Sequence, residues 1–372
     1  MPELTVSPIN VPLRPRSSQV WWRRRPRFAL EVRLEMGAWA QLFIILASVV
    51  FGLALSAAIL AVAGVSLQSL VGEFATTVAD PQSLRAVLNQ SAPLILVGVA
   101  ASAAFRARFW NLGLEGQMIM GGIAATAVSL GKIGPNELRL VFMALAAMFA
   151  GLVWVAVPAV LKSTLRVNEI IATLLLNYVA TYFLYDLLFG AWKDPTDSFP
   201  HSASYSGSER LPLIGGWVNA GLLLSMVAVA ATFWLLQVSR LGFYLRFIYA
   251  NPTMALRMGI STRSIVTGTV MISGALAGLA GFIVPAGMEG RLTQGFFEGY
   301  GFSGVLVAFL ARNNPMVAAL VACLVAVLFV LGQSLQIFYQ IPFAMVQLMQ
   351  AIIVMCVAAS DFFIRHRIVL QR

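Results

Sequence analysis

The chain is organised around one stretch, residues 109–122, which reads FWNLGLEGQMIMGG. It places a carboxylate, Glu115, and two side-chain amides, Asn111 and Gln117, among glycines and between apolar sequences. A charged side chain at the centre of a bilayer costs about 2.5–3.5 kcal/mol on insertion scales, so it normally faces protein or water. The glycines allow a helix to break or another backbone to approach closely. We therefore expect this stretch to lie on a polar path through a membrane.

Composition indicates the class of protein. The sequence is 59% hydrophobic and 11% charged, and its mean hydropathy is +0.84, whereas soluble domains are about 25% charged. No charged residue lies between Glu35 and Glu73, which is more than a helix needs to cross a bilayer. Because backbone polar groups in lipid must be bonded internally, such spans predict a helical bundle. We expect one all-α polytopic membrane domain.

Ten apolar runs are candidate spans. They cover residues 38–62, 91–105, 112–130, 140–161, 169–188, 217–238, 265–284, 302–310, 316–338 and 343–363. The run at 302–310 is short enough to be re-entrant, and 65–89 is expected to hold a short helix outside the membrane. Residues 91–188 and 265–363 each combine a short, glycine-flanked element with longer ones, in opposite orientations. This arrangement predicts a pseudo-symmetric core built from an inverted repeat.

Basic residues indicate topology rather than nucleic-acid binding. The net charge is +10, but the arginines crowd a segment at 1–36 and a tail at 366–372, which flank a transmembrane domain at 37–365. With ten spans and both termini in the cytoplasm, only six Lys and Arg residues fall outside: Arg85, Lys132, Arg139, Lys193, Arg210 and Arg291. That bias follows the positive-inside rule, so we expect the lipid bilayer and no nucleic acid as partner.

Motifs of catalysis are missing from the sequence. Cys323, Cys356, His201 and His366 stand apart from one another, so neither a disulfide framework nor a metal site is indicated. No G-x-x-x-x-G-K-[ST], H-E-x-x-H or G-x-S-x-G motif occurs. We expect a transport subunit that is not an enzyme and binds no cofactor. If ATP drives transport, ATP–Mg must bind to another chain.

Polar residues recur every four positions in the span 169–188, at Glu169, Thr173, Asn177 and Thr181. This spacing places them on one stripe of a helix. They either make interhelical hydrogen bonds, worth about 0.6–2 kcal/mol each, or line a water-filled path. For Glu115, pairing with an arginine or with backbone amides at a broken helix is the alternative to solute contact. The predicted substrate path consists of Asn111, Glu115, Gln117, Thr173 and Asn177.

The loop at 239–263 is the most polar internal one. Asn251 is suited to cap a short helix, Pro252 to begin it and Gly259 to close it. Met254 and Met258 are spaced to dock into a groove on a partner. The alternative is an ordinary surface loop.

Three motifs carry a family resemblance: FWNLGLEGQ at 109–117, the segment 167–178, and the segment 299–304 with RNNP at 312–315. In this order they resemble the permease subunits of bacterial ABC importers. The branch is that of nucleoside and simple-sugar permeases in the branched-chain amino acid/ribose superfamily. The resemblance covers residues 35–365.

This resemblance implies a ten-span importer fold in the bacterial cytoplasmic (inner) membrane. It implies an ABC ATP-binding subunit, a second related permease or a second copy of this chain, and an extracytoplasmic substrate-binding protein as partners. Nucleosides or related simple sugars would enter the cytoplasm by alternating access. The residues expected to couple to the ATPase are Asn251, Pro252, Ala255, Leu256, Arg257, Met258 and Gly259. The alternative is an ion-coupled secondary transporter with Glu115 or Glu169 as its ion site.

Overall fold

Long helices dominate the structure, a computed structural model that describes residues 27–33, 36–62 and 64–371. They are α1 (Ala38–Val62), α3 (Pro81–Arg106), α5 (Arg139–Leu165), α6 (Glu169–Phe189), α10 (Thr262–Val284), α12 (Pro315–Tyr339) and α13 (Phe343–Arg365). The shorter helices are α2 (Leu67–Ala79), α4 (Leu114–Leu130), α7 (Gly221–Phe233), α8 (Arg240–Ala250), α9 (Pro252–Arg257) and α11 (Tyr300–Leu310). One short helical turn, η1 (Gly207–Glu209), lies in the loop between α6 and β2. Two others directly follow α7 (η2, Trp234–Val238) and α10 (η3, Pro285–Glu289). Four strands, β1 (Arg27–Val32), β2 (Leu213–Ile214), β3 (Val218–Asn219) and β4 (His366–Gln371), form two small pairs.

The helices confirm a polytopic all-α membrane protein. Within the described residues, 8 helices are long and apolar enough to cross a membrane. The other two predicted spans correspond to α4 and α11, with 17 and 11 residues. At 1.5 Å per residue they extend only about 25 and 16 Å, less than the ~30 Å hydrocarbon core. The count of ten spans therefore stays a prediction.

Two predicted boundaries differ from the structure. The span expected at 91–105 begins ten residues earlier, because Asp80 caps α3 by accepting from the Ser83 N–H at 2.8 Å and Pro81 occupies its first turn. The span expected at 217–238 is wrong at its start, since Val218–Asn219 pairs as a strand with Leu213–Ile214. At both places polar loop residues adjoin an apolar run, so hydropathy alone does not show where the helix begins.

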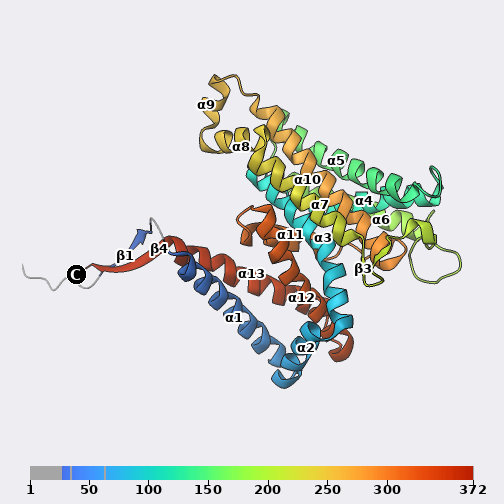
Figure 1. Ribbon diagram of the computed structural model, residues 1–372, viewed down its shortest axis with the longest axis horizontal. Coiled ribbons are helices and arrows are strands. Elements are labelled where there is room, and N and C mark those ends of the chain that lie inside the picture. Colours follow the sequence, from blue (N-terminus) through green and yellow to red (C-terminus); the bar gives the residue numbers. More distant parts are fainter. Residues whose placement is uncertain (1–26, 34–35, 63, 372) are drawn as a thin grey trace, which may run out of the picture.

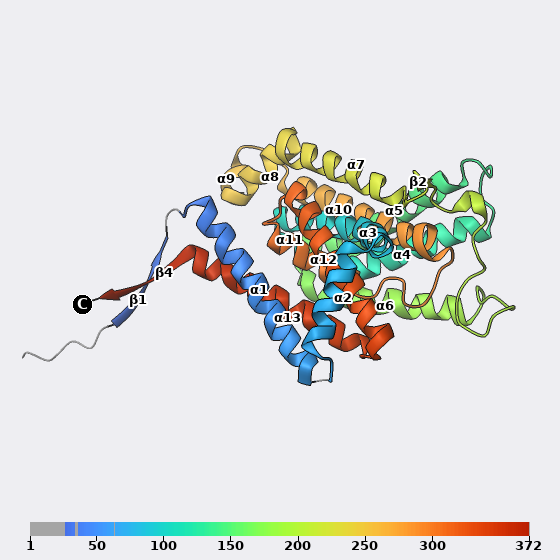
Figure 2. The ribbon, with the colours of Figure 1, turned by 60° about the horizontal axis from the view of Figure 1, so that its bottom comes forward.

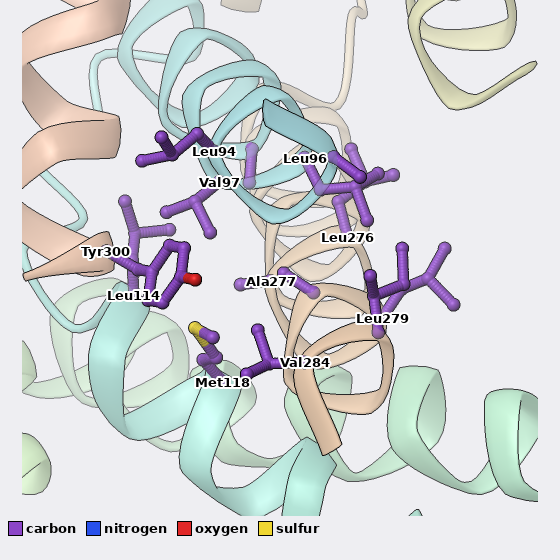
Figure 3. Close-up of a cluster of buried hydrophobic side chains, with 14 of the residues drawn as sticks. Leu94, Leu96, Val97, Leu114, Met118, Leu276, Ala277, Leu279, Val284 and Tyr300 are labelled. Carbon is purple, nitrogen blue, oxygen red and sulfur yellow. The ribbon is translucent and has the colours of Figure 1, made fainter. Parts of the chain in front are cut away.

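At the centre of the bundle lie α3 and α10, whose apolar stretches are the most completely buried of the long helices in the described part of the chain. Figure 3 shows their side chains meeting those of α4, including Leu94, Val97, Met118 and Ala277. Helix α5 packs against α10, and α12 packs against α3. The two halves of the chain thus exchange partners across the centre, as an inverted repeat requires.

Chain reversals support the same internal correspondence. Helices α4 and α11 are each followed within two residues by a left-handed backbone position, Lys132 (φ 49°) and Arg312 (φ 49°) respectively. Helices α5 and α12 are followed directly by Arg166 (φ 56°) and Gln340 (φ 53°). Corresponding helices therefore end in the same unusual conformation, although the two halves differ in sequence.

Glycines set the spacing at the central crossings. A Cβ atom at Gly121 of α4 or Gly151 of α5 would collide with the backbone of α10 at Gly274 or Gly278. One at Gly281 would collide with the carbonyl oxygen of Met118. Backbones touch here, so these positions accept no side chain.

The ends of the described chain lie together. Strands β1 and β4 pair antiparallel, with Arg27 opposite Gln371, and they lead into α1 and out of α13. Figures 1 and 2 show them at the end of the molecule that also carries α8 and α9, which we call the α8 end. Helix α2 and the β2–β3 pair lie at the opposite end. The sequence did not predict β1 within the segment 1–36, and residues 1–26 lie outside the described part.

Candidate transport site

The stretch that organises the sequence forms a break between two helices. Helix α3 ends at Arg106, α4 begins at Leu114, and the intervening backbone is not helical, with Arg108 at φ 55°. Such a break leaves amide and carbonyl groups without intrahelical partners inside the bundle. Where these groups find partners decides what the nearby polar side chains do.

Two buried amides close the break from one side. Asn111 and Gln117 exchange hydrogen bonds, with Gln117 Nε2 donating to Asn111 Oδ1 at 2.8 Å and Asn111 Nδ2 donating to Gln117 Oε1 at 3.0 Å. The Asn111 amide also donates to Ser273 Oγ of α10 at 3.2 Å, and its oxygen accepts from the Gly113 N–H. Both side chains are fully buried, so this amide pair joins the break to the central helix.

Helix α6 closes the break from the other side. Asn177 Oδ1 accepts from the Gly116 N–H at 2.8 Å, and Asn177 Nδ2 donates to the Leu112 carbonyl at 3.0 Å. Thr173 Oγ1 accepts from the Leu112 N–H at 3.3 Å. The structure therefore brings Asn111, Gln117, Thr173 and Asn177 together and bonds each of them to protein groups.

Glu115 occupies a different position. Its carboxylate interacts with the backbone N–H groups of Gly301 and Phe302 in the first turn of α11. A carboxylate at a helix N-terminus complements the helix dipole. The starts of α4 and α11, the two short helices of the repeats, thus meet at Glu115. This matches the pairing with backbone amides at a broken helix that the sequence left open.

Glu169, the alternative ion ligand, lies at the α8 end. It forms an ion pair with Lys162 at 2.5 Å, and Lys162 also donates to the carbonyl of Arg108 at 3.0 Å. Arg108 in turn donates to the Tyr249 carbonyl of α8 at 2.8 Å. These contacts hold the break, α5, α6 and α8 together.

A polar face that we did not predict lies on the opposite side of α6. Tyr178 and Tyr182 are 64% and 70% exposed, and Asp186 one turn further on is exposed as well. Tyr178 lies nine residues into α6, at a depth of about 14 Å. The spacing of four was visible in the sequence, but tyrosines in an apolar run are more often taken for packing or for an interfacial belt.

Glu298 extends this exposed face. It precedes α11 and is exposed, and its charge acts on Tyr185 and on Glu115. Because α11 is about 16 Å long and ends at the α8 end, its start lies near the middle of the bundle. We call Tyr178, Tyr182, Asp186 and Glu298 the tyrosine face. Tyr178 and Glu298 expose polar groups near mid-depth, where a lipid-facing surface would be apolar, and Asp186 lies in the last turn of α6.

The loop before β2 covers the end opposite to α8. Arg139 Nη1 donates to Glu209 Oε1 at 2.9 Å, and Ser129 Oγ and the Ser206 N–H donate to Glu209 Oε2 at the same distance. Burial alone would raise the pKa of Glu209, but these hydrogen bonds outweigh it and hold the pKa below its usual range. The carboxylate thus fastens the loop to the ends of α4 and α5.

Residues 251–259 form the short helix expected from the sequence. Asn251 Oδ1 accepts from the Met254 N–H at 3.0 Å, Pro252 begins α9, and Gly259 follows its end at φ 77°. Ala255 is fully buried. The exposed side chains include those of Thr253, Met254, Leu256, Arg257 and Met258. The helix and its end therefore present three apolar groups, one hydroxyl and one cation at the α8 end.

Comparison with known proteins agrees with this architecture. Residues 83–358 match the model of a family described as branched-chain amino acid transport system / permease component. The chain is 35% identical to the glucose ABC transporter permease protein TsgB13 of Haloferax volcanii, over 84% of this chain and 87% of that protein.

Two further relatives carry nucleoside names. The guanosine ABC transporter permease protein NupP of Bacillus subtilis is 31% identical over 86% of this chain and 94% of its own length. The nucleoside ABC transporter permease protein NupB of Lactococcus lactis is 26% identical over 76% and 81%. No solved structure matches the chain. The chain belongs to the family of branched-chain amino acid-type ABC transporter permeases, and it is a membrane-embedded transport subunit rather than an enzyme.

Proposed function

We propose that this permease imports nucleosides, or related simple sugars, into the cytoplasm by alternating access. The observation that carries the proposal is the pair of relatives named for guanosine and glucose, each matched over more than four fifths of its length. Both solutes present sugar hydroxyl groups, so one kind of polar path suits them. ABC permeases work with an ATP-binding subunit and a substrate-binding protein, and on this proposal ATP–Mg binds only to the former.

The tyrosine face supports a path between two permease chains. An exposed carboxylate at mid-depth, such as that of Glu298, would cost about 2.5–3.5 kcal/mol against lipid, so water or another chain must cover it. Tyrosine rings offer stacking surfaces to a base or a sugar, and carboxylates accept hydrogen bonds from sugar hydroxyls. A second permease, related or identical, would supply the opposite wall.

The buried network has a different place in this scheme. Asn111, Glu115, Gln117, Thr173 and Asn177 remain our candidates for groups on the path. Because all five already have protein partners, they would meet solute only when the break at 107–113 opens. Alternating access requires such a rearrangement of hydrogen-bonded elements. In this proposal the break acts as the inner gate.

Orientation follows from the basic residues. Arg106, Arg108, Lys162, Arg246 and Arg257 all lie at the α8 end, which the positive-inside rule assigns to the cytoplasm. We propose that α9, with its neighbours from Asn251 to Gly259, docks there into the ATP-binding subunit. The membrane would be the bacterial inner membrane, with the loop fastened by Glu209 facing the binding protein.

Uptake by intact cells tests the substrate. A strain lacking this permease and the same strain with the gene restored are given radiolabelled guanosine, adenosine, ribose or glucose. We expect restoration to raise ATP-dependent nucleoside uptake at least tenfold. If only glucose uptake responds, the sugar is the substrate. Uptake that persists without the ATP-binding subunit and collapses with the ion gradient would contradict an ABC importer.

A further inference from the structure

One polar atom beside the break takes no part in the hydrogen-bond network described above. The indole Nε1 of Trp154, on α5, is buried and has no hydrogen-bond partner among the described residues. An indole N–H is a donor only, and when it is buried it usually finds an acceptor. Burying a donor without a partner costs free energy, and here the cost falls next to the transport site. A state of the protein in which this N–H is bonded would not carry that cost.

The indole N–H lies beside the start of α4. Trp154 belongs to the part of the bundle where α4, α5 and α6 pack against one another (Figure 1). A Cβ atom at Gly116 would lie 3.1 Å from Trp154 Nε1 and 2.8 Å from Asn177 Oδ1. The donor and the amide oxygen therefore border the same position, and no more than the space of a missing methyl group separates them. In this state of the chain they do not bond.

Asn177 has room for a second donor. Its Oδ1 accepts from the Gly116 N–H, which is the one bond that this oxygen makes within the described residues. A carboxamide oxygen has two lone pairs, so one of them is free. Both ends of the carboxamide are fixed by the backbone of the break, since Nδ2 donates to the Leu112 carbonyl. The oxygen can therefore turn towards the indole only when that backbone moves.

We infer that Trp154 is a positioning residue for transport, and that its N–H bonds Asn177 Oδ1 when the break at 107–113 opens. The inference rests on the proposed role of the break as the inner gate. Opening separates Asn177 from the backbone of the break, and the Trp154 N–H is a replacement donor within reach. Because this bond forms in only one of the two states, it shifts the equilibrium towards the open state.

Hydrogen–deuterium exchange of the purified full-length chain measures opening of the break without any solute. Peptides that cover residues 107–117 report how often its backbone amides lose their partners. Trp154→Phe keeps an aromatic ring and removes the N–H, so the open state loses a bond and the closed state loses an unpaired donor. We expect exchange in this segment to slow about tenfold. If Trp154 served packing alone, the smaller ring would leave space and exchange would become faster.

Trp192→Phe is the matched control, because it makes the same substitution in another partly buried ring on the core, beyond the last residue of α6. It should leave exchange at 107–117 within about twofold. Trp154→Met also lacks the N–H and decides if Trp154→Phe does not fold. Exchange in the Trp154 variant that is unchanged or faster would overturn the inference.

A double-mutant cycle identifies the acceptor. In an Asn177→Ala background the proposed acceptor is absent, so Trp154→Phe should change exchange by less than about twofold. If Trp154→Phe slows exchange equally in both backgrounds, water or another group accepts the N–H, and the inference is overturned.

Uptake connects this bond with transport. In the restored strain, Trp154→Phe should lower guanosine uptake about fivefold, because the open state is less populated, and Trp192→Phe should leave it unchanged. Slower exchange with unaltered uptake would overturn the positioning role. If the unsubstituted chain takes up no guanosine, the proposed substrate fails, whereas the exchange measurement still decides whether Trp154 and Asn177 bond.

Discussion

At the scale of single residues, Asn177 shows how a polar side chain in a membrane helix can serve the backbone. It bonds the Gly116 N–H and the Leu112 carbonyl, neither of which has an equivalent helical partner. Asn177→Ala leaves both groups unpaired, at about 1–3 kcal/mol each, so the thermal midpoint of the purified chain should fall by several degrees. Thr181→Ala, which removes only a bond to the Asn177 carbonyl of the same helix, is the control. Equal midpoints for the two variants would refute this role.

Gly281 gives a second prediction at this scale. A methyl group there would meet the carbonyl oxygen of Met118, so α4 and α10 would have to separate. We expect Gly281→Ala to destabilise the chain by about 1–3 kcal/mol, as overpacking does. A methyl group added at Gly268 in the same helix would meet no atom within 4 Å, so Gly268→Ala should be neutral or slightly stabilising. Chemical denaturation measures the free energy of unfolding of both variants. A Gly268→Ala variant that is less stable than Gly281→Ala would contradict the prediction.

Glu209 makes the outer loop sensitive to acid. Its pKa is lowered in the folded chain, so the ionised form adds stability that is fully present above the unfolded pKa of about 4.3. This stability is lost as the pH falls through the lowered pKa. Acid-active protease should therefore cleave residues 192–212 faster at pH 3 than at pH 5. Glu209→Gln should be cleaved quickly at both pH values, and a pH dependence that persists in this variant would assign the effect elsewhere.

Sequence reasoning selected the polar residues at the break but not their geometry. The four-residue spacing in α6 placed Thr173 and Asn177 on one stripe, and the structure agrees. It could not show that their partners are the backbone groups of residues 112 and 116, because that depends on where the chain stops being helical. The tyrosine face was missed because exposure of Tyr178 and Glu298 depends on which helices pack together, and periodicity does not report that.

At the scale of elements, α9 is the one whose form was predicted most fully. Its cap, its proline start and its glycine end were all legible, since each depends on neighbouring residues only. Its function stays a prediction. Arg257→Glu reverses the charge of the one cation that α9 exposes, so the ATPase activity of the complex should lose its stimulation by solute-loaded binding protein, and uptake should fall at least tenfold.

Arg263→Glu makes the same charge reversal at the first turn of α10 and should leave coupling within about twofold. An equal loss of uptake and of ATPase stimulation in both variants would indicate a general effect of charge at the α8 end. Unchanged uptake and ATPase stimulation in Arg257→Glu would remove α9 from the coupling scheme.

At the scale of the whole molecule, the tyrosine face makes a prediction about water. In a background without Cys323 and Cys356, Glu298→Cys should react quickly with a charged, membrane-impermeant thiol reagent, because thiolates form in water and not in lipid. Added solute should slow the reaction at least threefold. Leu320→Cys, on an exposed apolar part of α12, should stay unreactive. If both cysteines react alike, the tyrosine face borders no path.

The sequence was sufficient for the class, the internal repeat and most helices, because long apolar runs report burial in lipid directly. It does not decide whether α4 and α11 cross the membrane, because both are shorter than the hydrocarbon core. These are the helices that start inside the bundle, where Glu115 joins them. A short, re-entrant element was predicted at 302–310 and a full span at 112–130, but only the packing shows that the first turns of α4 and α11 meet.

The pairing of β1 with β4 bears on how the molecule is made. Arg27 pairs with Gln371, and α1 packs against α13. The first helix therefore contacts one that is synthesised long afterwards. Until then α1 has no long-range neighbour along most of its length, and closure of this contact carries the entropic penalty of a very long loop. The contact between α1 and α13 is therefore among the last to form during assembly of the bundle. A chain truncated before residue 343 lacks α13, so its α1 should remain without this neighbour in the bilayer and be exposed to membrane-embedded proteases.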